Sequence, residues 1–191
     1  MSRLAAVLIY AALQGFLIAL LARLFGDRRP EHEGRLTLNP FVQVSAWGAA
    51  VAALFGVSWI RSVWYGSSGS RLGRWHVALV VVLGLILILG LIPVVDLLRR
   101  AALLLPPTGA SAALLVMAHV QAIAVASVTL NCLPIPGLIG GGLLQVIRPD
   151  RERRLRAAEP ICLFLVIGLI VAFGFPDDET ITQAAGRLFA R

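Results

Sequence analysis

Charged side chains are scarce in this sequence, and their scarcity decides the class of protein. Only 14% of the 191 residues are charged, whereas 59% are hydrophobic. A water-soluble domain carries about 25% charged residues, so this composition excludes an ordinary soluble surface. The apolar runs are long enough for helices that cross a bilayer of roughly 30 Å hydrocarbon thickness. We therefore expect one compact membrane domain, with no room for a second, soluble one.

Lysine is absent, so all 17 basic residues are arginine, and the formal net charge is +7. A strongly basic balance is also typical of nucleic-acid-binding proteins. Here, however, the arginines lie in short loops beside apolar runs, where positive charge orients a membrane protein and contacts anionic lipid headgroups. We expect lipid contacts and no nucleic-acid partner.

Cysteine and membrane-embedded acidic residues are also nearly absent. Cys132 and Cys162 lie in or beside hydrophobic segments without metal-type spacing, so we interpret both as buried free thiols and expect no cofactor. The sequence offers no serine, histidine and acid set, no paired carboxylates and no phosphate-binding loop. The lack of intramembrane carboxylates argues against a transporter, which needs a polar path.

Five hydrophobic segments predict an all-α, polytopic integral membrane protein. They cover residues 4–25, 47–63, 76–98, 110–133 and 161–175, within a single membrane domain of residues 1–176. Five crossings would divide the arginines almost equally between the two membrane faces, so the positive-inside rule does not fix an orientation. After the fourth segment, the sequence LPIPGLIGGG combines two prolines with four glycines and must interrupt regular helix.

Two further segments are too short or too polar to cross. Residues 35–45 read RLTLNPFVQVS, an alternating, β-branched pattern that predicts a short β-hairpin-like segment after the first span. Residues 177–191 begin with acidic residues and place Ile181, Leu188 and Phe189 on one helical face. We expect an amphipathic tail helix on the membrane or on a partner.

Two motifs together resemble the minimal branch of the site-2 protease family of intramembrane zinc metalloproteases. The first is Gly26-Asp27 followed by GRLTLNP at residues 34–40, with a glycine at Gly48. The second, LNCLPIPGLIGGGLL, is similar to the NLLPIPPLDGG element of the family through seven residues: Asn131, Leu133, Pro134, Ile135, Pro136, Gly140 and Gly141. The resemblance covers about residues 4–145, and it implies the family's helical core with a hairpin near the substrate.

The chain departs from the family at every zinc ligand. The HExxH motif of the family needs two histidines one turn apart and a glutamate that activates the metal-bound water. The corresponding stretch reads QGFLI, so Gln14, Gly15 and Ile18 replace the first histidine, the glutamate and the second histidine. Ile139 replaces the third ligand, and Gln43 and Ser45 stand where the hairpin usually has histidine and aspartate. We therefore expect no bound metal and no zinc proteolysis.

One intramembrane histidine leaves an enzymatic alternative open. His119 lies inside the fourth segment, where an ionisable residue is a functional hypothesis by default. Its simpler interpretation is a hydrogen bond between helices. The alternative is a membrane hydrolase with a site outside the family pattern that includes His119, or a relocated metal site built from His76 and His119.

The sequence favours a catalytically inactive protein that binds membrane segments. In the family, the cleft receives a transmembrane helix, and loss of the metal leaves a place for binding. We expect such a protein to act as a scaffold, assembly factor or accessory subunit of a membrane complex, in a bacterial inner membrane. The expected partner-binding residues are Thr37, Leu38, Asn39, Pro40, Asn131, Pro134, Pro136, Ile181, Leu188 and Phe189.

Overall fold

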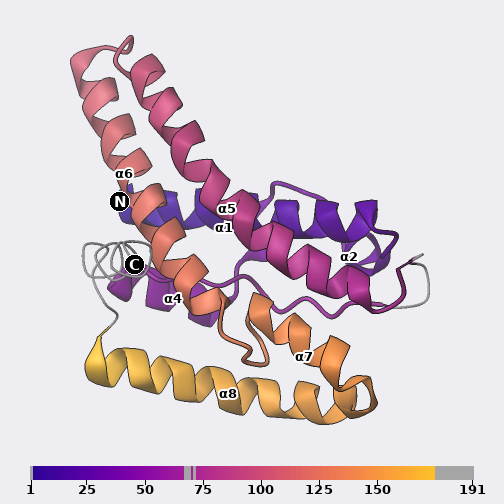
Figure 1. Cartoon of the computed structure of the whole chain (residues 1–191). Helices are drawn as coiled ribbons and strands as arrows, with labels where there is room; N and C mark the ends of the chain where they lie inside the picture. The colour runs from indigo at the N-terminus through magenta and orange to yellow at the C-terminus, as the bar shows by residue number, and fades with distance from the viewer. Residues whose placement is uncertain (1, 67–69, 71, 175–191) are drawn as a thin grey trace, which may run out of the picture.

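The structure, a computed structural model, describes residues 2–66, 70 and 72–174. Within these residues the regular structure is helical and contains no sheet, so the predicted all-α class is confirmed. The helices are α1 (Ser2–Leu24), α2 (Arg29–His32), α3 (Pro40–Gln43), α4 (Ala46–Phe55), α5 (Trp75–Ala102), α6 (Pro107–Asn131), α7 (Gly142–Ile147) and α8 (Glu152–Phe173), with short 3-10 turns at Ile139–Gly141 and Pro149–Arg151 (Figure 1).

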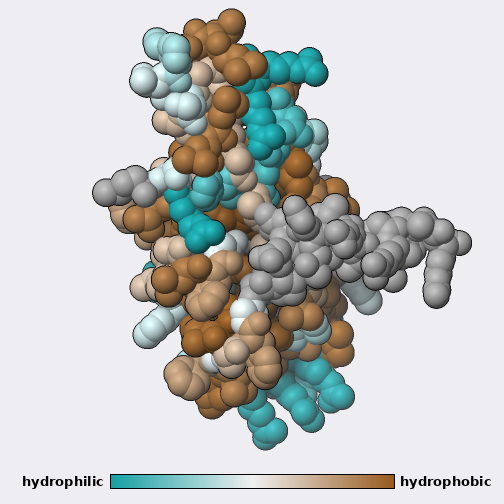
Figure 2. All heavy atoms as spheres, turned by 90° about the vertical axis from the view of Figure 1, so that its left-hand side faces the viewer, coloured by the Kyte–Doolittle hydropathy of each residue, from teal (hydrophilic) through white to brown (hydrophobic). Residues whose placement is uncertain are grey.

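Four described helices, α1, α5, α6 and α8, are long and apolar enough to cross a membrane. They correspond to four of the predicted spans. Helix α8 begins earlier than the predicted span, because Glu152 and the arginines that follow it form the first turns of the helix instead of a loop. Seen from the side on which the N-terminus lies, the surface is mostly hydrophobic, with hydrophilic residues in separate groups (Figure 2). The chain is thus an integral membrane protein by the length and composition of its helices.

The predicted second crossing, at residues 47–63, is not among the described helices that are long enough to span a membrane. Helix α4 covers only its first half and stops at Gly56, which adopts the left-handed conformation (φ +75°) that ends many helices. The chain then turns back, since Arg3 at the start of α1 donates to the carbonyl groups of Ala53 and Leu54, whereas Tyr65 lies beside Arg29, past the other end of α1. Residues 27–66 therefore enter and leave from the same end of the helix bundle, and we call them the re-entrant segment.

The predicted hairpin also does not form. Asn39 accepts a hydrogen bond from the Phe41 amide through its side chain, and Pro40 occupies the first position of α3, so these two residues start a helical turn where the pattern indicated a strand. A single antiparallel bridge between Val44 and Ile60 is the β pairing among the described residues. It joins the two arms of the re-entrant segment.

Two apolar clusters hold the bundle together. The larger lies between α1, α5 and α6 and includes Tyr10, Ile18 and Ile88. Gly84 of α5 lets that helix approach closely, because a Cβ there would overlap the side chain of Ile18. The smaller cluster joins α8 to α4, α6 and the loop after α6 through residues that include Val51, Leu130 and Val166. Helix α8 runs along one side of the molecule, away from α5 (Figure 1).

Two further expectations concern the cysteines and the C-terminal tail. Cys132 is exposed and Cys162 is half-buried, so the interpretation of both as buried thiols is wrong: Cys132 caps α6 on an outer face, and Cys162 lies on the sparsely covered α8. The predicted amphipathic tail, with Ile181, Leu188 and Phe189, lies outside the described residues.

Candidate functional site

A set of buried polar side chains lies between the helices of the bundle. Gln14, Gln43, Ser127 and Asn131 are fully buried, and Ser58 is 2% exposed. They come from α1, α3, α6 and the returning arm of the re-entrant segment. We call this set the mid-bundle polar layer.

Gln43 fills the space above Gly15. A Cβ atom at position 15 would overlap the amide group of Gln43, so the side chain of any larger residue would collide with it. The Gln43 amide donates to the carbonyl oxygens of Arg35 (2.6 Å) and Thr37 (3.2 Å), which stabilises the irregular backbone before α3. Gln43 therefore joins α3 to α1 by close packing on Gly15.

Asn131 bonds to three separate parts of the chain. Its side-chain amide donates to the carbonyl groups of Ser127 (2.7 Å) and Ser58 (3.3 Å), and its side-chain oxygen accepts from the Ile139 amide (3.2 Å). Ser127 in turn accepts from the Ser58 amide at 2.8 Å. These bonds satisfy polar backbone of the re-entrant segment and of the LPIP loop, which would be costly to leave unpaired away from water.

Several polar atoms in this region have no hydrogen-bond partner within the described part of the chain. They are both amide atoms of Gln14, the side-chain oxygen of Gln43, the hydroxyl of Tyr10 and the indole nitrogen of Trp59. Amides and hydroxyls can orient a polar group but are weak ligands for a transition metal. Among the residues that the structure describes, no group of three or more His, Cys, Asp or Glu side chains is placed to hold a metal.

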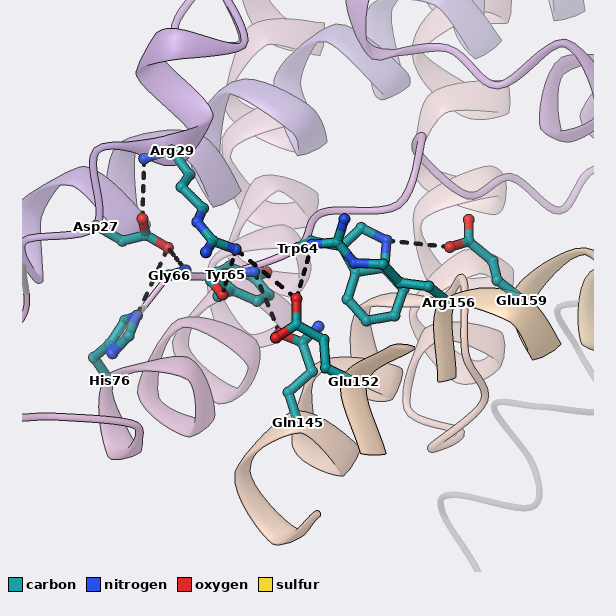
Figure 3. Close-up of polar contacts among 10 residues, drawn as sticks. All are labelled: Asp27, Arg29, Trp64, Tyr65, Gly66, His76, Gln145, Glu152, Arg156 and Glu159. Carbon is teal, nitrogen blue, oxygen red and sulfur yellow. Dashed lines mark hydrogen bonds and ion pairs between the residues drawn. The ribbon is translucent and has the colours of Figure 1, made fainter. Parts of the chain in front are cut away.

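A second polar site lies where α1 ends and α5 begins (Figure 3). The Asp27 carboxylate, 2% exposed, accepts from the amides of Arg29 (2.9 Å) and Gly66 (2.8 Å). The Nε2 atom of fully buried His76 lies 3.7 Å from this carboxylate, and its Nδ1 atom contacts the Gly73 carbonyl oxygen. Asp27 thus ties both ends of the re-entrant segment to the first turn of α5.

This second site continues to α8 through Tyr65 and Trp64. Arg29 donates to the Tyr65 carbonyl (3.2 Å), and the Tyr65 amide donates to Gln145 of α7 (3.3 Å). Burial raises the pKa of the Tyr65 hydroxyl, while Arg35 opposes the rise and Asp27 adds to it, so this hydroxyl stays protonated at neutral pH.

Glu159 of α8 completes the connection. Its carboxylate accepts from the Trp64 indole at 3.1 Å and from the Ser62 hydroxyl, and the Arg156 guanidinium stacks 4.7 Å from the centre of the Trp64 ring (Figure 3). The charged Glu159 side chain therefore anchors α8, which otherwise packs sparsely against the rest of the bundle.

The histidine alternatives receive different support. His76, at the start of α5, lies beside Asp27. The Nδ1 atom of His119 contacts the Leu115 carbonyl oxygen of its own helix at 2.7 Å. The described contacts therefore do not bring the two histidines together into a metal site. A hydrolase involving His119 stays a prediction.

The predicted partner-binding residues divide into exposed and buried sets. Leu38, Asn39 and Pro134 are exposed, and Thr37, Pro40 and Pro136 are half-buried, so these can face another molecule. Asn131 is fully buried and acts inside the fold. Ile18 and Ile139, which the resemblance would align with metal ligands, belong to the larger apolar cluster.

Sequence reasoning missed most of the second site. The sequence places Asp27 only in a motif and His76 only in an alternative metal site, and no motif includes Glu159. Glu159 carried a usable signal, because an acidic residue next to a proline at the edge of an apolar run is uncommon without a partner. Ser58 and Ser127 carried no signal, since single buried serines have no distinctive sequence pattern.

The fold and the polar layer together define a class, a helical membrane protein with a re-entrant segment held by buried amides. Comparisons with protein families, with curated proteins and with solved structures found no match for the chain.

Proposed function

We propose that this chain is a catalytically inactive, site-2-protease-like membrane protein that binds a membrane segment of another protein. It would act as a scaffold, assembly factor or accessory subunit of a complex in a bacterial inner membrane. The proposal rests on the motifs quoted above and on one feature of the re-entrant segment, the exposed backbone of residues 36–41.

These residues lie beside the membrane-spanning helix α1, between its middle and its C-terminal end. Gln43, two residues past Phe41, packs on Gly15 in the middle of α1, and the chain reaches it from Arg35, which hydrogen-bonds near the end of the bundle. The side chains of Leu38 and Phe41 are 56% and 79% exposed. Lipid can cover such apolar side chains, so these two alone do not require a partner protein.

The backbone beside them supports the proposal of a partner protein. Among the described residues, no hydrogen bond is recorded for the amides of Leu36, Thr37 and Leu38. Lipid chains cannot supply acceptors, and an unsatisfied amide in hydrocarbon costs several kcal/mol. An extended or unwound stretch of a partner's membrane segment supplies them by pairing alongside residues 36–38, as peptides pair with exposed strand edges elsewhere.

The re-entrant path also supports an orientation for this proposal. With the second crossing removed, Arg3, Arg99 and Arg100 are the described arginines at one end of the bundle. Apart from Arg61, which lies on the returning arm of the re-entrant segment, the other end carries ten: Arg23, Arg28, Arg29, Arg35, Arg74, Arg148, Arg151, Arg153, Arg154 and Arg156. By the positive-inside rule, the arginine-rich end faces the cytoplasm. A single cysteine introduced at Arg154 in a cysteine-free background should then react with a membrane-impermeant maleimide only after the cells are opened, whereas one at Arg100 should react in intact cells.

The binding proposal is tested by photocrosslinking in native membranes. A photoreactive phenylalanine at position 38 or 41 should crosslink to one protein at near-stoichiometric yield, identified by mass spectrometry. The same probe at the exposed Leu87 of α5 is the matched control and should crosslink to lipid. Crosslinks to lipid alone at positions 38 and 41 would contradict binding, and zinc at about one per purified chain would contradict inactivity.

A further inference from the structure

A groove separates the first turns of α5 from α7, and its lining is almost wholly apolar. The lining residues are Arg74, Trp75, Ala78, Leu143, Val146 and Ile147, around a volume of about 560 Å³. Trp75 and Ile147 are each 67% exposed, so the groove opens toward the surroundings of the bundle. Exposed tryptophan at a helix start is typical of the membrane–water interface.

A second hollow adjoins this groove and shares Arg74 with it. Its other lining residues are Tyr65, Val77, Gln145, Pro149 and Glu152, and its volume is about 250 Å³. This hollow is more polar than the groove, and it lies at the arginine-rich end of the bundle. Arg74 therefore stands at the junction of an apolar groove and a polar hollow, an arrangement that suits a molecule with one apolar and one charged part.

We propose that this pair of hollows binds one anionic phospholipid. An acyl chain lies in the groove along Ala78 and Val146, the phosphate pairs with Arg74, and the rest of the headgroup enters the polar hollow. No described carboxylate lies within ion-pair distance of Arg74, so its charge is available for the phosphate.

The acidic residue in the polar hollow does not oppose this occupant. Glu152 pairs with Arg156 at 2.8 Å and faces Arg29 at 4.0 Å, which offsets its charge. Gln145 accepts from the Tyr65 amide through its oxygen, which leaves its amino group to donate to a headgroup oxygen. Basic residues gathered at one membrane face attract anionic lipid to it.

The site is tested by lipid retention in the intact protein. The protein is reconstituted with equal amounts of phosphatidylglycerol and phosphatidylcholine, extracted in mild detergent, and the bound lipid is counted by native mass spectrometry. We expect about one phosphatidylglycerol per chain and at least a fivefold preference over phosphatidylcholine. Arg74→Gln should reduce the retained phosphatidylglycerol at least fivefold, whereas the matched variant Arg99→Gln, at the other end of the bundle, should leave it unchanged.

Two further measurements separate lipid from a free anion. Ala78→Leu fills the apolar groove but keeps Arg74, so it should also reduce retention, while glycerol phosphate at millimolar concentration should not compete. Circular dichroism checks that both variants keep their helix content. Equal retention by Arg74→Gln and the unaltered protein, equal retention of both lipids, or displacement by glycerol phosphate would each overturn the proposal.

Discussion

Helices α1 and α8 are both apolar enough to cross a membrane, yet they have different roles in this molecule. In the apolar stretch of α1, 56% of the residues are buried inside the protein, against 11% in α8. The buried face of α1 carries small and amide residues such as Ala11, Gln14 and Gly15, whereas α8 presents Phe164, Leu165 and Leu169 outward. Hydrophobicity therefore predicts which segments cross, while small and polar residues mark the helix that the rest of the chain packs around.

The largest expected difference between the two helices comes from a pair of glycines. Gly15→Ala in α1 places a Cβ against Gln43, and overpacking of this kind costs about 1–3 kcal/mol. Gly168→Ala in α8 meets nothing within 4 Å and gains helix propensity, so it should be neutral or stabilising by up to about 1 kcal/mol. Unfolding in mixed detergent with increasing dodecyl sulfate measures both.

The double variant Gly15→Ala, Gln43→Ala serves as the control for that pair, because removal of the Gln43 side chain makes room for the new methyl group. It should recover part of the loss. Equal midpoints for Gly15→Ala and Gly168→Ala would show that α1 does not pack as closely as described.

A somewhat smaller effect is expected at Asn131. Asn131→Leu removes three hydrogen bonds and leaves the Ile139 amide and the Ser58 carbonyl without their Asn131 partner, at a cost of about 1–2 kcal/mol. Thr129→Val, on the outer face of the same helix, loses only a bond to its own Val125 carbonyl and should change stability by less than about 0.5 kcal/mol. If the two variants unfold at the same detergent composition, the mid-bundle polar layer does not hold the re-entrant segment.

The comparison of α1 with α8 also explains what the sequence could predict. Helix class and four of the spans follow from long apolar runs, a signal that needs no knowledge of neighbours. The second span failed because the same Ala- and Gly-rich composition suits both a crossing helix and a re-entrant one, and only the bonds from Ser58 and Arg3 to distant residues distinguish them.

The candidate site was predictable only where a motif carried it. Asn131 and Gln43 were located through the motif, but the packing of Gln43 on Gly15 depends on the path of residues 35–45, for which the pattern wrongly favoured a hairpin. The Asp27 and Glu159 contacts join residues between 39 and 97 positions apart, and no local pattern encodes such pairings.

For α8, the anchoring carboxylate should matter less than the packing of α1. Glu159→Gln keeps the shape but weakens the bonds to Ser62 and Trp64, which should cost about 1 kcal/mol and act on α8 alone. With Cys132→Ser as background, the rate at which Cys162 reacts with a membrane-permeant thiol reagent should rise, because α8 moves away more often. The unfolding midpoint of the remaining helices should hardly move, and a large global loss would mean that α8 is part of the core.

The smallest effect is expected at the rim of α1. Arg3→Gln removes two long, exposed hydrogen bonds, 3.3 and 3.5 Å, to the end of α4, so stability should change by less than about 0.5 kcal/mol. The same unfolding assay checks this. If Arg3→Gln lowered stability as much as Gly15→Ala, then Arg3, and not the mid-bundle polar layer, would be the main contact that holds α4.

The re-entrant segment has a consequence for the order in which the chain is assembled during synthesis. The Ser58 carbonyl can accept its hydrogen bond only after Asn131, 73 residues later in the chain, has been synthesised. At about 5–20 residues per second, that delay is on the order of 4–15 seconds. Until α6 has been made, the Ser58 carbonyl lacks its donor on Asn131 and the Ser58 amide lacks its acceptor on Ser127, so the returning arm must be sheltered by the insertion machinery or at the membrane surface. Nascent chains that end before α6 should therefore be recognised as incomplete and degraded, although they already contain α1 and α5.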